Sequence, residues 1–202
     1  MSDRIAVFID YQNVHLVAHE LFAPYGKPVH ETVVHPVKIA ERIVSKRRGD
    51  NELVAVRVYR GRPNPEHQPT NTAANDGQKA AWEPHRRVTV VRRDLNYRGW
   101  PDEKPHEKGI DVALAVDYVR MSMLEECDVA ILFSADRDLL PALEMAFQNT
   151  KPNTEIACWS GRATSPKPLW FPEYLPNGKY LPYCHFLKEE DWDACRDHTP
   201  YV

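Results

Sequence analysis

Four aspartates occupy positions at which α/β proteins build catalytic sites. Asp10 ends the first apolar run of the chain, Asp111 begins a long helical pattern, and Asp136 and Asp138 follow a later apolar run. A single aspartate after a strand often only caps the next helix. Several carboxylates within a few ångströms raise one another's pKa, and a hard cation such as Mg²⁺ or Mn²⁺ relieves their repulsion. The joint placement predicts a divalent-metal site suited to phosphoryl displacement, with Asp10, Asp111 and Asp136 as metal ligands.

The elements that must position these aspartates alternate between strand-like and helical patterns. Apolar runs cover residues 4–10, 53–60, 88–93, 128–134 and 155–159, with helical patterns at 37–46 and 109–126. Strands without polar alternation indicate a sheet buried on both faces, hence mainly parallel strands in an α/β three-layer sandwich. With the strand order 3-2-1-4-5, the first and fourth strands are neighbours where the order reverses, and open sheets place their crevice there. We therefore expect Asp10, Asp111 and Asp136 to meet at that edge.

Length and composition fit one globular domain over residues 1–202. The chain is 43% hydrophobic and 27% charged, and no apolar run reaches the roughly 20 residues of a membrane helix. We expect a cytoplasmic protein with no membrane partner, a core at about 4–160 and, over 161–202, an aromatic, proline-rich loop followed by a short strand and helix. The loop at 165–184 either covers the sheet edge or forms a lid or base-stacking surface. Four cysteines without a C-x-x-C pair indicate reduced, buried thiols.

The charge is distributed unevenly along the chain. The net charge of −3 argues against a general nucleic-acid coat protein, yet residues 38–108 hold 16 Lys and Arg against 10 Asp and Glu. Arg60, Arg62 and Lys108 are the cations expected nearest the metal site, where they would bind the phosphates of a substrate. Phosphate-cradling motifs of the types G-x-x-x-x-G-K and G-x-G-x-x-G are absent, and so is the G-x-S-x-G elbow. No histidine or cysteine spacing matches a familiar zinc site.

Three blocks of the sequence, FIDYQNVH, EKGIDVALAVDYV and ILFSADRDLLPALE, resemble the signature blocks of the NYN domain family of the PIN-like nuclease superfamily. The resemblance covers roughly residues 4–160. It implies a Rossmann-like sheet, a Mg²⁺ or Mn²⁺ site and cleavage of RNA. The residues that match the family's catalytic set are Asp10, Asn13, Asp111, Asp136 and Asp138. Ala135 stands where many relatives have glycine, which leaves the turn geometry and the substrate preference open.

The leading hypothesis is a metal-dependent endoribonuclease that acts on single-stranded or looped RNA. The alternative is a non-catalytic module of the same fold that binds RNA or recruits a protein. Phosphotransfer through an aspartyl-phosphate is disfavoured because Gln12 stands where that chemistry needs a second aspartate. The sequence is compatible with a homodimer and with a regulatory protein partner, and it establishes neither.

Overall fold

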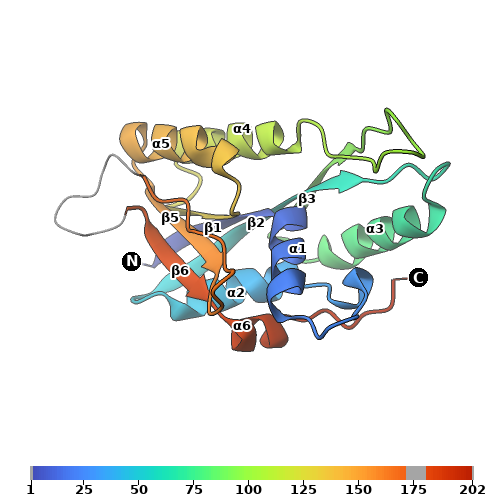
Figure 1. Ribbon diagram of the computed structural model, residues 1–202. Coiled ribbons are helices and arrows are strands. Elements are labelled where there is room, and N and C mark those ends of the chain that lie inside the picture. Colours follow the sequence, from blue (N-terminus) through green and yellow to red (C-terminus); the bar gives the residue numbers. More distant parts are fainter. Residues whose placement is uncertain (1, 172–180, 202) are drawn as a thin grey trace.

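A six-stranded parallel sheet forms the centre of the computed structural model, which describes residues 2–171 and 181–201. The strands run in the order β3-β2-β1-β4-β5-β6, and every neighbouring pair is parallel (Figure 1). This confirms the predicted α/β sandwich and extends its strand order by one strand beside β5. The strands are β1 (Asp3–Asp10), β2 (Asn51–Arg62), β3 (Val88–Asp94), β4 (Val129–Phe133), β5 (Asn153–Trp159) and β6 (Tyr183–Leu187).

Helices cover both faces of the sheet and so complete three layers. In Figure 1, α4 and α5 lie on one face, and α1, α2 and α6 lie on the other. The helices are α1 (Tyr11–Phe22), α2 (Pro36–Lys46), α3 (Pro69–Trp82), α4 (Ile110–Met123), α5 (Leu140–Asn149) and α6 (Glu189–Ala194), with short 3-10 turns at η1 (Val29–Glu31) and η2 (Arg137–Leu139). Each of these helices is too short or too polar to cross a bilayer, within the part of the chain that is described.

The alternation of side chains along β1 explains why its sequence is apolar throughout. Ile5, Val7 and Ile9 point into the cluster shared with α1 and α2, whereas Ala6 and Phe8 point into the cluster shared with α4 and α5. All five are fully buried. A strand in the middle of a sheet that is covered on both faces exposes neither side to water, so both sets of side chains contribute to hydrophobic stabilisation.

The loop expected at 165–184 includes residues 172–180, which lie outside the described residues. Leu169 and Phe171 are buried and pack in the core on the side of α4 and α5, which agrees with a covering role for this part of the connection. The lid or stacking surface stays a prediction. All four cysteines are free and buried, as expected.

Candidate active site

The strand order reverses at β1, which lies between β2 and β4, and Asp10 is the last residue of β1. Its carboxylate is 4% exposed. One oxygen caps α1 by accepting a hydrogen bond from the Asn13 N–H (3.4 Å), and the other accepts a bond from the Ser134 hydroxyl (2.7 Å) just beyond β4. Two neighbouring strand ends therefore hold this carboxylate in place at the crevice of the sheet.

Two further carboxylates join Asp10 at this edge. Oxygen atoms of Asp10, Glu107 and Asp111 all lie within 4.8 Å of one another. Asp111 comes from the first turn of α4, and Glu107 from the connection that precedes it. Between them Gly109 has a φ of 76°, a left-handed conformation that favours glycine and turns the chain sharply into the helix. The Glu107 carboxylate also accepts a hydrogen bond from the Gly61 N–H at the end of β2, which attaches the connection before α4 to that strand.

The cluster carries more negative charge than the surrounding protein neutralises. Burial, reinforced by the Asp111 and Glu107 carboxylates, raises the pKa of Asp10 to about 7, although the Ser134 hydroxyl acts in the opposite direction. Burial likewise raises the pKa of Glu107 and of Asp111. Arg60 and the Gly61 N–H offset part of this effect at Glu107, yet the pKa of each of the three carboxyl groups stays raised. Three such oxygen donors match the preference of Mg²⁺ and Mn²⁺ for hard oxygen ligands. The residues present therefore fit a divalent cation.

Asp136 and Asp138 lie beside the cluster of Asp10, Glu107 and Asp111 and are not part of it. The charge of Asp136, and to a smaller extent that of Asp138, raises the pKa of Asp111, so both are within electrostatic range. Asp136 caps the turn η2 by accepting a hydrogen bond from the Asp138 N–H (2.9 Å), and its own N–H donates to the Ser134 hydroxyl (3.0 Å). The structure thus brings Asp10 and Asp111 together and places Asp136 at their rim; its role as a metal ligand stays a prediction.

Asn13 links the first helix to the loop that carries Asp136. Its side-chain oxygen accepts a hydrogen bond from the Ala135 N–H (3.0 Å). The side chain that was expected to accompany the carboxylates therefore holds the loop after β4 at a fixed distance from α1. Because Ala135 makes this contact through its backbone, the departure from glycine leaves the contact intact.

The three predicted RNA-binding cations have different surroundings. Arg60 stacks on the ring of Tyr11, 4.7 Å from its centroid. Arg62 is paired with Asp76 (2.9 Å), so part of its charge is already neutralised. Lys108 is exposed next to Glu107. Arg60 and Lys108 are therefore better placed than Arg62 to meet a substrate phosphate, and all three assignments stay predictions.

Glu107 was missed by the sequence reasoning, which considered acidic residues only where a strand ends or a helix begins. The signal was present, because this glutamate opens the block EKGIDVALAVDYV, two residues before Gly109. Gly109 has a left-handed conformation at the entrance of α4. That conformation was not apparent from the spacing alone.

The comparisons with known proteins bear on the family. No curated protein matches the chain significantly. A solved structure, a protein of unknown function from Vibrio parahaemolyticus, is 18% identical, with 77% of this chain and 81% of that chain covered and a TM-score of 0.49. The model of the NYN domain matches residues 4–168, which contain the whole acidic cluster. The chain therefore belongs to the NYN domain family.

Proposed function

We propose that this protein is a divalent-metal-dependent endoribonuclease that hydrolyses phosphodiester bonds in single-stranded or looped RNA. The observation that carries the proposal is the group formed by Asp10, Glu107 and Asp111 at the reversal of strand order, in a chain whose family has a PIN-like nuclease fold. Unpaired RNA is the preferred substrate class because its backbone can bend into a crevice lined by carboxylates, which a rigid duplex cannot do as readily.

Asp10, Glu107 and Asp111 would hold the Mg²⁺ or Mn²⁺ ion, with Asp136 as a further ligand at the rim. When bound, the cation supplies a nucleophile at neutral pH by lowering the pKa of water, and it offsets the charge that develops on the phosphate. The carboxylates of the chain would hold the cation in position for this reaction. Ser134 fixes the buried Asp10 through its hydroxyl.

The remaining residues position the substrate and the loop beside it. Asn13 holds the loop after β4 through the Ala135 amide, and so keeps Asp136 and Asp138 at the rim. Arg60 and Lys108 attract the RNA backbone without regard to base sequence. Their positive charges balance the repulsion that a crevice of carboxylates would otherwise exert on phosphate.

The test compares the purified wild type with Asp10→Asn and Glu107→Gln. The substrates are a labelled single-stranded RNA, a stem-loop RNA and a single-stranded DNA, each incubated with Mn²⁺, Mg²⁺ or EDTA. Asp50→Asn is the matched control, because Asp50 is an exposed aspartate beside the start of β2, at the opposite edge of the sheet. We expect the wild type and the control to cleave RNA only with a metal ion, and the two site variants to lose this cleavage.

Absence of cleavage by the wild type in either metal, with RNA still bound, would overturn the nuclease proposal and support a non-catalytic RNA-binding module. Equal cleavage by the wild type and both site variants would instead indicate a contaminating nuclease. Sequencing of the fragment ends then shows which phosphodiester bonds are cut and whether DNA is also a substrate.

A further inference from the structure

A large groove opens directly beside the acidic cluster. It has a volume of about 1240 Å³ and lies between α1, α3, the connection after β3 and the C-terminal segment 196–201. Two of its lining residues, Tyr11 and Gln12, follow Asp10 in the chain, and a third, Gly61, donates its N–H to Glu107. A strand of RNA whose cleaved bond lies at the cluster would therefore extend into this groove.

Arg60 supplies a positive charge in the groove that makes no direct ion pair within the described part of the chain, although the nearby Glu107 carboxylate acts on it electrostatically. Its guanidinium stacks on Tyr11 (4.7 Å) and near Trp82 (5.6 Å), and it donates one hydrogen bond to Gln78 (2.5 Å). Among the described residues no carboxylate lies within ion-pair distance of it, in contrast to Arg62. A stacked, immobilised guanidinium with free N–H groups is suited to bind a phosphate group in two-point fashion.

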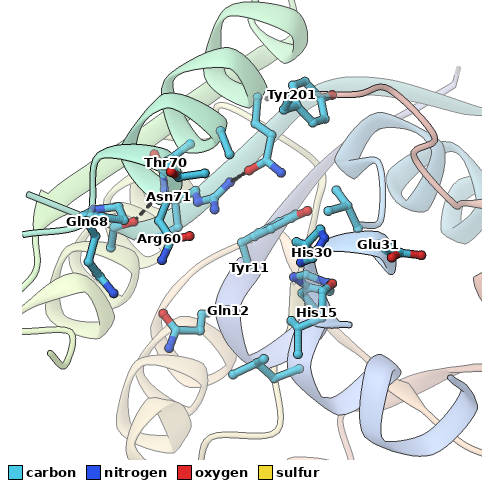
Figure 2. A pocket seen from close by; sticks show the side chains of 18 of the residues that line it. Tyr11, Gln12, His15, His30, Glu31, Arg60, Gln68, Thr70, Asn71 and Tyr201 are labelled. Carbon is cyan, nitrogen blue, oxygen red and sulfur yellow. Dashed lines mark hydrogen bonds between the residues drawn. The ribbon is translucent and has the colours of Figure 1, made fainter. Parts of the chain in front are cut away.

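Side chains that suit a nucleobase line the groove around Arg60. Figure 2 shows Arg60 and Tyr11 between Asn71 of α3 and His15 of α1, with Gln12 close by. Gln12 and Asn71 are exposed, and within the described part of the chain neither side chain has a hydrogen-bond partner. An amide offers a donor and an acceptor side by side, which is the pattern that the edges of bases present.

An aromatic side chain completes this lining. Trp100 is half-buried and reaches the groove from the connection after β3. It packs near Tyr97, with ring centroids 5.6 Å apart, which restricts its motion. Unpaired bases stack on such rings whatever their sequence.

One wall of the groove is formed by residues outside the part of the chain that the family model matches. That match ends at residue 168, whereas segment 196–201 lines the groove. Asp197 anchors the segment by accepting hydrogen bonds from the Trp82 indole N–H (3.2 Å) and the Tyr201 hydroxyl (2.6 Å). Tyr201 packs against Gly77 of α3, where an added Cβ would lie 3.3 Å from its ring. The groove is therefore closed by a structured segment.

We propose that this groove is a nucleotide-binding subsite that selects the RNA base beside the cleaved bond. Arg60 binds the phosphate of that nucleotide, Trp100 stacks on the base, and Gln12 and Asn71 hydrogen-bond to its edge. The proposal rests on the proposed function, because the acidic cluster defines where the cleaved bond lies. It adds that the enzyme selects the base at one position of the RNA.

The test measures binding in EDTA, which prevents cleavage, and cleavage in Mn²⁺. Binding of fluorescein-labelled oligoribonucleotides, each of a single base type, is followed by fluorescence anisotropy. The variants are Arg60→Gln and Asn71→Ala, and the matched control is Arg48→Gln, which removes an exposed charge before β2. Thermal unfolding of every variant checks that it is folded. Because Asn71 is exposed and has no hydrogen-bond partner among the described residues, its variant remains informative if Arg60→Gln does not fold.

We expect the wild type to prefer one base, and its cleavage sites to carry that base at a fixed position. Arg60→Gln should weaken binding of every oligonucleotide by at least about tenfold, since it removes charged hydrogen bonds. Asn71→Ala should weaken only the preferred one, by roughly fivefold, which is the loss of a neutral hydrogen bond. Arg48→Gln should bind like the wild type.

The two proposals fail in different ways. Base-dependent binding that Asn71→Ala abolishes, without any cleavage, would support the subsite and refute the nuclease. Metal-dependent cleavage with wild-type binding by both groove variants would overturn the subsite and leave the nuclease standing. Equal binding of all base types by the wild type would also overturn the proposed selectivity.

Discussion

Replacing Asp10 by Asn should stabilise the metal-free protein, although it removes a proposed metal ligand. Asp10 is 4% exposed, and burial raises its pKa from 3.8 to about 7. This difference corresponds to roughly 4 kcal/mol between the charged and neutral forms. The folded protein binds this proton more tightly than the unfolded chain does. The stability that this proton contributes is therefore fully present below about pH 4, and it is lost as the pH rises to about 7.

An amide at this position carries no charge, so it avoids that cost. It replaces a carboxylate that accepts hydrogen bonds from Ser134 and Asn13 on two separate oxygens, and keeping only one oxygen acceptor costs about 1 kcal/mol. We therefore expect Asp10→Asn to raise the free energy of unfolding by roughly 3 kcal/mol near pH 8. Near pH 4, where the wild-type carboxyl group is protonated in the folded protein, the gain should vanish.

Urea unfolding in EDTA, followed by circular dichroism at about pH 8 and about pH 4, measures this difference. Asp50→Asn, an exposed substitution at the opposite edge of the sheet, should show no pH-dependent difference from the wild type. Destabilisation of Asp10→Asn by the same amount at both pH values would refute the reasoning, because it would mean that ionising Asp10 costs nothing in the folded protein.

Three further predictions concern other parts of the molecule. Glu107→Gln should weaken binding of Mn²⁺, since it removes one of three clustered carboxylates; calorimetric titration tests this, and unchanged affinity would contradict its place in the site. Burial lowers the pKa of His15 to about 4, so folding stability should fall by roughly 3 kcal/mol as the pH drops from about 6.5 to about 4. His15→Gln should remove this acid sensitivity in urea unfolding, and an unaltered pH profile would argue against it. Arg47→Leu should cost about 3 kcal/mol, because buried Glu155 loses the guanidinium 2.8 Å away; urea unfolding with wild-type stability would count against this ion pair.

The fold follows from the sequence because the strands are apolar on both faces. A strand such as β1 can bury all of its side chains only in a sheet that is covered by helices on both sides, and such sheets are parallel. The same argument predicted that Asp10 and Asp111 lie close together, since the ends of parallel strands share one edge. The structure confirms that these two carboxylates meet.

Details of the site depended on local backbone geometry that residue types do not specify. Glu107 enters the cluster from the connection before α4, where its carboxylate binds the Gly61 N–H and Gly109 has a left-handed conformation. Asp136 lies at the rim because it caps the turn η2, so one of its oxygens is already engaged. Spacing along the chain does not determine whether a carboxylate caps a turn or faces a cation, because both roles follow a strand equally well.

Hydrophobic patterning and strand direction act along the chain, so the parallel α/β sandwich, the sheet edge that carries the acidic cluster and two of its carboxylates could be predicted from the order of residues. The third carboxylate and the groove beside it became apparent only in three dimensions. That groove brings Arg60 of β2 and Asn71 of α3 together with segment 196–201, which returns to the sheet from the far end of the chain. Contacts between segments so distant in sequence depend on packing in three dimensions, and no local pattern records them.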